Sequence, residues 1–156
     1  MITLEKKDVS IEETLVNAIN GILVPMDKKG IELTVDSPEG LTISHDSRWT
    51  SEALFNLLDN AVKYTPAGGS IHVSVQKWEI YLKIDVTDTE RGIPEHEQAT
   101  IFRRFCREEA VHDIEDIGIG LYLAREIIMM QIGYFLVMSE VGKGSAFSVF
   151  LPWDKR

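Results

Sequence analysis

The 156 residues of the chain are 44% hydrophobic and 26% charged, a balance typical of one globular domain with a single core. The formal net charge of −9 argues against nonspecific binding to nucleic acid or to an anionic membrane surface, because both are negatively charged. No stretch approaches the roughly 18 consecutive apolar residues of a membrane-spanning helix, and the first residues lack the pattern of a signal peptide. The single cysteine, Cys106, excludes an internal disulfide, fits a reducing compartment and gives no basis for a structural zinc site.

The first part of the chain predicts a helix, two short strands and a second helix. Ser10-Ile-Glu-Glu13 has the pattern of a capping box, and apolar residues follow it at helical spacing until Pro25 or Gly30 ends the helix. Residue alternation and periodicity predict strands over residues 31–35 and 41–43 and a helix from about Ser47 to Tyr64.

The rest of the chain predicts two hairpins with a helix between them. Alternating strands are expected over residues 70–77 and 80–86, connected by Trp78-Glu79. A polar stretch over residues 107–116 shows no clear periodicity. A helix from Gly118 to about Met130, strands over residues 134–139 and 145–151, and a turn at Gly142-Lys-Gly144 are predicted after it. Because the strands come as hairpins, we expect a mixed or antiparallel sheet covered on one face by helices.

The helix predicted at residues 47–64 carries polar side chains suited to a metal-bound nucleotide. The i, i+4 and i, i+3 spacings place four of them along one side: Glu52, Asn56, Asn60 and Lys63. An Asn oxygen can ligate Mg²⁺, and a Lys ammonium offers a point charge to phosphate. An ordinary amphipathic helix with surface asparagines explains this segment equally well when it is taken alone.

Five motifs in a fixed order remove that ambiguity. The N box is residues 52–66, the first glycine box 88–94, the F box 101–107, the second glycine box 118–127 and the last glycine box 139–147. This order, covering about residues 1 to 152, resembles the catalytic ATP-binding domain of two-component sensor histidine kinases. The same superfamily, called GHKL, holds the gyrase-type, MutL-type and heat-shock-chaperone ATPases. The resemblance implies the Bergerat-type α/β two-layer sandwich, with a mostly antiparallel sheet and about three helices on one face.

The resemblance also assigns residues to the adenine end of a nucleotide. Asp88 would accept a hydrogen bond from the exocyclic amine of adenine and so distinguish ATP from GTP, although an Asp at this place also caps turns. Gly92 would let the backbone approach the base, while Ile93 and Tyr64 would give it apolar and stacking surface. Tyr64 fits a plain core position as well.

For the phosphate end, the resemblance implies that Asn60 ligates Mg²⁺, that Asn56 supports the same cluster and that Lys63 reaches a phosphate. Gly118 and Gly120 are expected to open a helix whose free amides bind anions, or else to serve close helix packing. The same glycine box adds two nucleotide-binding positions, Ile119 and Leu121, and the last glycine box adds Ser145.

A mobile ATP lid is expected at about residues 103–117, where Arg104 and Arg107 would contact the γ-phosphate unless they are solvated surface side chains. The catalytic set is therefore Asn56, Lys63, Arg104 and Arg107.

Two departures from the family pattern add negative charge, since Glu90 and Asp116 stand where the family has glycine. If either carboxylate points toward the nucleotide, one like-charge pair at ~5 Å and an effective dielectric of ~20 costs on the order of 3 kcal/mol, or about 100-fold in affinity; if both point to solvent, the cost is small. Milder departures are Gln131-Ile132-Gly133, where the family often has His-Gly-Gly, and Ala146, where it often has Thr.

The leading hypothesis is the ATP-binding catalytic domain of a sensor histidine kinase, which binds Mg·ATP and donates its γ-phosphoryl group to a histidine. That histidine is expected in a helical dimerisation domain outside this chain, and a response regulator would be an indirect partner. Residues 1–9 would be a linker remnant and residues 10–156 the ATP-binding domain. We expect a cytoplasmic domain without membrane or nucleic-acid contact, in a parent protein anchored in the bacterial inner membrane.

Two alternatives stay open. The first is a degenerate GHKL-fold regulatory module whose nucleotide binding is weakened by Glu90 and Asp116. The second is a serine kinase of the anti-sigma-factor type or a gyrase-like ATPase. The latter is disfavoured because Asn56 stands where the ATPases have a general base.

Overall fold

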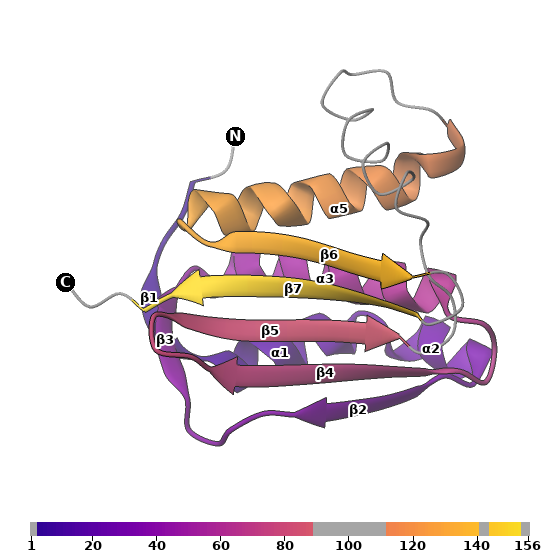
Figure 1. Cartoon of the computed structure of the whole chain (residues 1–156), viewed down its shortest axis with the longest axis horizontal. Helices are drawn as coiled ribbons and strands as arrows, with labels where there is room; N and C mark the ends of the chain where they lie inside the picture. Colours follow the sequence, from indigo (N-terminus) through magenta and orange to yellow (C-terminus); the bar gives the residue numbers. More distant parts are fainter. Residues whose placement is uncertain (1–2, 89–111, 141–143, 154–156) are drawn as a thin grey trace.

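The computed structural model describes residues 3–88, 112–140 and 144–153, which form a layer of helices on one face of a five-stranded sheet (Figure 1). The strands of this sheet are β2 (Glu32–Asp36), β4 (Ser70–Lys77), β5 (Tyr81–Asp88), β6 (Tyr134–Glu140) and β7 (Gly144–Pro152). The other elements are β1 (Lys7–Ser10), α1 (Ile11–Asn20), α2 (Leu23–Lys29), β3 (Thr42–His45), α3 (Ser47–Tyr64) and α5 (His112–Met130).

The sheet has the order β2-β4-β5-β7-β6 and is mostly antiparallel. The edge pair β2–β4 is parallel, while β4–β5, β5–β7 and β6–β7 are antiparallel. Alternate residues of β4 and β5 are buried against the helices, as the period-2 pattern predicts. The predicted two-layer sandwich with a mixed, mostly antiparallel sheet is confirmed.

Helix α3 is the central element of the helical layer, because it packs against α1 on one side and α5 on the other. Its apolar stripe includes Leu54, Leu57 and Leu58, all completely buried. Asp46 caps its first turn by accepting a hydrogen bond from the Trp49 amide at 2.9 Å. The helix begins and ends at the predicted residues, Ser47 and Tyr64.

The predicted first helix is wrong in its extent, because the chain forms two helices there. Helix α1 ends at Asn20, and α2 contains Pro25 as its third residue. A proline is tolerated there because the amides of the first helical turn have no intrahelical acceptor. Gly30, at φ 65°, then caps α2 in the left-handed conformation. The expected capping box does not form, since the Ser10 side chain makes no capping hydrogen bond.

Two further elements differ from the prediction. Residues 7–9, expected within a linker remnant, form β1 together with Ser10 and pair with β3 in an antiparallel two-stranded sheet. Helix α5 begins at His112 and not at Gly118. Residues 112–117 of the expected lid are therefore helical, and its residues 103–111 lie outside the described part of the chain. Glycine weakens a helix by roughly 1 kcal/mol relative to alanine but does not prevent it, so Gly118 was a poor marker of the helix start.

The sheet face turned away from the helices carries a row of aromatic side chains. Ring centroids lie 5.5 Å apart for Trp78 and Phe150, 6.1 Å for Phe150 and Tyr81, and 5.5 Å for Tyr81 and Tyr134. The Lys83 ammonium lies 4.9 Å from the centroid of the Trp78 ring. These edge-to-face and cation–π contacts shield the open face where no described helix covers it. None of the helices in the described ranges is both long and apolar enough to span a bilayer.

Candidate functional site

The candidate site lies at the C-terminal half of α3, which packs against both α5 and β5. In Figure 1 the last turn of α3 and the end of β5 lie at the same end of the sheet. Asp88 is the last residue of β5 and is 5% exposed. Asn60, one turn before the end of α3, is 3% exposed. Two polar side chains, one on α3 and one on β5, are thus buried at the same end of the molecule.

Asn60 is the most informative of these side chains. Neither its amide nitrogen nor its amide oxygen has a hydrogen-bond partner among the residues that the structure describes. Leaving a buried polar group unsatisfied costs about 1–3 kcal/mol, so native proteins do it rarely. An amide oxygen is also a ligand that a hard cation such as Mg²⁺ accepts. Asn60 therefore has the chemistry and the unused bonding capacity of a ligand-binding residue.

Asn56 and Gly120 are brought together across the α3–α5 contact. A Cβ atom placed on Gly120 would lie 3.7 Å from Cγ and 3.9 Å from Oδ1 of Asn56. Asn56 and Gly120, which are 64 positions apart in the sequence, therefore lie on one surface. Because α5 begins at His112, the amides of Gly118 and Gly120 are not at a helix N-terminus, and the expected anion site on free helix amides is wrong. Gly120 instead leaves the space above the Asn56 amide free of a side chain.

Lys63 lies at the rim of the site. Its ammonium is 3.3 Å from Asp59 Oδ2 in an i, i+4 ion pair, and its side chain is 39% exposed. The end of α3 is held by Lys29 of α2, whose ammonium donates to the Val62 carbonyl at 2.7 Å. A cation at a helix C-terminus also complements the helix dipole. The carbonyl end of α3 is thus fixed, while the Lys63 side chain makes, among the described residues, one surface ion pair of small net strength.

The remaining predicted site residues fall into two groups. Tyr64 is half-buried against the core, Leu121 is buried in the core and Ile119 is 37% exposed on α5. Outside the described residues lie Gly92, Ile93, Arg104 and Arg107, together with Glu90 and the side chains of Asp116 and Ser145. Within the described residues, no three His, Cys, Asp or Glu side chains gather as a metal-binding group.

Sequence reasoning did not assign a role to Gln131, which the structure shows to be buried and fully engaged. Its Oε1 accepts from the Asp46 amide at 2.9 Å, and its Nε2 donates to Thr50 Oγ1 at 2.9 Å. The residue just after α5 is thereby tied to the first turn of α3. The sequence signalled this residue through its departure from the family pattern. Whether that departure stabilises or destabilises the protein could be judged only from the structure.

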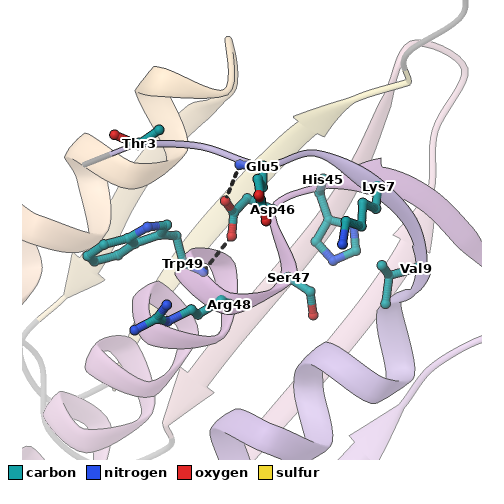
Figure 2. Close-up of a pocket in the computed structure, with 9 residues that line it drawn as sticks. All are labelled: Thr3, Glu5, Lys7, Val9, His45, Asp46, Ser47, Arg48 and Trp49. Atoms are coloured by element: carbon teal, nitrogen blue, oxygen red, sulfur yellow. Dashed lines mark hydrogen bonds between the residues drawn. The ribbon is translucent and has the colours of Figure 1, made fainter.

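The first turn of α3 also borders a pocket of about 410 Å³ (Figure 2). Both Asp46 carboxylate oxygens are already engaged there, Oδ1 by the Trp49 amide at 2.9 Å and Oδ2 by the Glu5 amide at 2.5 Å. Trp49 precedes Asn60 by eleven residues, or about 16 Å along the helix axis. This pocket is therefore separate from the candidate site.

His45, beside that pocket, is held as a neutral ring. Nδ1 lies 2.8 Å from the Ile43 carbonyl, which can only accept, so Nδ1 carries the proton and Nε2 accepts from Thr14 Oγ1 at 2.7 Å. Burial lowers the pKa of His45 below its ordinary value, although the Ile43 carbonyl and the Asp46 carboxylate favour the charged ring. The group stabilises the join between α1, β3 and α3.

The fold and the site define a nucleotide-binding α/β sandwich. More particularly, the chain belongs to the histidine kinase-, DNA gyrase B- and HSP90-like ATPase family, whose model matches residues 45–155. Its relatives include the adaptive-response sensory kinase SasA of Synechococcus sp. (strain JA-3-3Ab), 40% identical over 136 residues, which are 86% of this chain and 36% of that protein. Another is the sensor protein DivL of Caulobacter vibrioides, 33% identical over 150 residues, which are 96% of this chain and 19% of that protein. The chain spans about a third of the length of the SasA proteins it matches.

Solved structures agree on the fold. The catalytic domain of the histidine kinase ThkA, in a nucleotide-free form, superposes with a TM-score of 0.82 at 21% identity, covering 96% of this chain and 97% of that one. Full-length ShkA in complex with AMPPNP has a TM-score of 0.82 at 25% identity, covering 99% of this chain and 32% of that one. The chain is thus an ATP-binding domain of the histidine-kinase type.

Proposed function

We propose that this domain binds Mg·ATP and donates the γ-phosphoryl group to a histidine on a helical dimerisation domain outside these 156 residues. The observation that carries the proposal is the buried Asn60 amide, which has no described partner and lies at the same end of the sheet as Asp88. A protein gains nothing from leaving such a group unsatisfied unless a ligand completes its bonding. ShkA, whose structure holds the ATP analogue AMPPNP, has the same fold.

The described residues fit a magnesium-bound nucleotide. Asp88 supplies a carboxylate for the amine of adenine, and Asn60 supplies an amide oxygen for Mg²⁺. When bound, the ion neutralises phosphate charge that a chain of net charge −9 would otherwise repel. Lys63 can exchange its weak pair with Asp59 for a phosphate oxygen.

At the phosphate end, we propose that Asn56 binds a phosphate oxygen or a Mg²⁺-bound water through the space that Gly120 leaves open. Ile119, Gly118, Leu121 and Ser145 would contribute backbone surface around the nucleotide. Arg104 and Arg107 would neutralise charge that develops on the γ-phosphoryl group during transfer. Gly92 and Ile93 would contact the base.

The acceptor and the partners complete the proposal. Phosphoryl transfer depends mainly on positioning, so this chain should bind nucleotide but phosphorylate only a histidine that another domain delivers. A response regulator would receive the group afterwards. ThkA, which shares this fold at 22% identity, has been solved in complex with the response regulator protein TrrA. Membrane anchoring of the parent protein stays a prediction.

Titration calorimetry of the 156-residue chain with ATP, in Mg²⁺ and in EDTA, tests the proposal. We expect binding that Mg²⁺ strengthens, and we expect Asn60→Leu to weaken the Mg²⁺-dependent binding at least ~10-fold, because the ion loses a ligand. Asn17→Leu, at an exposed position of α1, is the matched control and should leave the affinity unchanged. Failure of the wild-type chain to bind ATP would refute the proposal. Binding that appeared only after Glu90→Gly and Asp116→Gly would indicate a degenerate module.

A further inference from the structure

Thr65 carries a second unsatisfied polar group at the same end of the molecule. The residue follows the last residue of α3 and is 0% exposed. Its Oγ1 makes no hydrogen bond to any residue that the structure describes. A hydroxyl can both donate and accept a hydrogen bond. Burying it without a partner therefore lowers the stability of the folded protein. The N-box resemblance gave this hydroxyl no role.

The backbone around Thr65 is firmly held, so the unsatisfied hydroxyl is not a sign of a loose chain. The Thr65 amide donates to the Ala61 carbonyl at 2.9 Å and continues the bonding pattern of α3 by one residue. Thr65 itself is extended, with φ −82° and ψ 127°. The turn after it is closed by the Gly69 amide, which donates to the Pro66 carbonyl at 3.0 Å. The side chain is therefore presented from a fixed point.

The other two buried threonines of the helical layer show that this chain normally satisfies such groups. Thr50, on the first turn of α3 and 0% exposed, accepts from Gln131 at 2.9 Å. Thr14, on α1 and 0% exposed, bonds both His45 at 2.7 Å and Ser47 at 2.7 Å. Both lie toward the end of the layer away from Asp88. Only at the Asp88 end are buried side chains such as Asn60 and Thr65 left with unused bonding capacity among the described residues.

We infer that Thr65 is a further nucleotide-binding residue, whose hydroxyl bonds the nucleoside part of ATP directly or through one ordered water. The inference rests on the proposed function. The position along α3 decides which part of the nucleotide is contacted. Asn56, beside Gly120, marks the phosphate end, and Thr65 follows it by nine residues, or about 13 Å along the helix axis. Thr65 directly follows α3, and the end of α3 lies at the same end of the sheet as the end of β5, where Asp88 is the last residue (Figure 1).

Thr65→Val tests the inference, because valine keeps the branched shape and removes only the hydroxyl. Losing one neutral hydrogen bond should weaken binding about 5-fold to 10-fold. The loss should be equal for ATP and ADP, because the contact does not involve the γ-phosphate. The melting temperature of the free protein should stay the same or rise, since an unsatisfied buried hydroxyl is removed. Thr65→Ser should keep the wild-type affinity within about 2-fold.

Thr50→Val is the matched control on the same helix. It removes a satisfied hydroxyl and the shorter of the two hydrogen bonds that Gln131 Nε2 donates, so the melting temperature should fall by a few degrees while nucleotide affinity stays unchanged. An affinity of Thr65→Val within about 2-fold of wild type overturns the inference, and so does a loss confined to ATP. A different result would refute the proposed function, namely that the wild-type chain binds neither ATP nor ADP.

Discussion

The turn after α5 offers a direct test of backbone strain, because Ile132 occupies it at φ 63°. The Ile132 amide donates to the Met129 carbonyl at 3.0 Å, and the Gly133 amide donates to the Ile128 carbonyl at 3.0 Å. These two bonds are those of a Schellman motif, in which the left-handed residue is usually glycine. A β-branched residue is poorly suited to that conformation. We predict that Ile132→Gly stabilises the protein.

The size of the effect follows from three contributions. A left-handed conformation costs a residue with a Cβ roughly 1–2 kcal/mol, which glycine avoids. Glycine loses more conformational freedom on folding than other residues do, and this offsets roughly 0.5–1 kcal/mol of the gain. Ile132 is 73% exposed, so removing its side chain loses little apolar burial. The net gain should be about 0.5–1 kcal/mol, or a rise of roughly 1–4 °C in the melting temperature.

Urea unfolding and calorimetric melting of wild type, Ile132→Gly, Ile132→Asn and Ile132→Ala measure this effect. Asparagine tolerates the left-handed region, so Ile132→Asn should also stabilise the protein. Alanine does not favour that region, so Ile132→Ala should gain less stability than the glycine and asparagine variants. An Ile132→Gly protein less stable than wild type would refute the reasoning. It would mean that the exposed isoleucine makes a stabilising contact worth more than the strain.

Two substitutions and one pH effect probe the end of α5 and the start of α3. Gly133→Ala should destabilise by at least ~2 kcal/mol, because its Cβ would lie 2.2 Å from the Phe150 carbonyl oxygen. Gln131→Leu should cost about 1–3 kcal/mol, since the buried Asp46 amide loses its acceptor. Burial lowers the pKa of His45, so its contribution should be complete above about pH 6.5 and fall with pH below that value, by at most ~1.4 kcal/mol per pH unit. Urea unfolding measures all three, the last between pH 5 and pH 8.

Each of these predictions has a control. Gly40→Ala is a glycine substitution without a steric clash, since nothing lies within 4 Å of its added Cβ, although its φ of 68° adds some strain. If Gly133→Ala cost no more than Gly40→Ala, the steric argument would be wrong. For Gln131, a Gln131→Glu variant keeps an acceptor for the Asp46 amide, so its free energy of unfolding should fall less than that of Gln131→Leu. For the pH effect, His45→Asn should flatten the dependence of the unfolding free energy on pH below about pH 6.5; an unchanged dependence in this variant would assign the effect to other groups.

How much of the fold was predictable depended on local signals. Helix α3 and β4 have the predicted bounds, because Asp46 caps the helix, the apolar stripe is regular and the strand alternates cleanly. Strand β1, Lys-Asp-Val-Ser, has no such pattern and forms only because β3, far along the chain, pairs with it. The start of α5 was missed for a related reason. Packing against α3 helps to keep the helix continuous through Gly118, where the low helix propensity of glycine weakens it.

The candidate site divides along the same line. Helical spacing placed Asn56, Asn60 and Lys63 on one side of α3, which the sequence alone could justify. The approach of Gly120 to Asn56 joins distant segments, so only the family resemblance anticipated it. That Asn60 is buried without a described partner, and that Gln131 has three, are facts of packing that no pattern of residue types encodes.

The most direct measurement of the central claim is titration calorimetry of the 156-residue chain with Mg·ATP and with Mg·GTP, repeated with Asp88→Asn. The account predicts an ATP dissociation constant between about 1 μM and 1 mM, GTP binding at least ~10-fold weaker, and loss of ATP binding in Asp88→Asn. Asp85→Asn, on the same strand, is the matched control and should bind as wild type does. Equal affinity for both nucleotides, or ATP binding unchanged in Asp88→Asn, would contradict an adenine site at the end of β5.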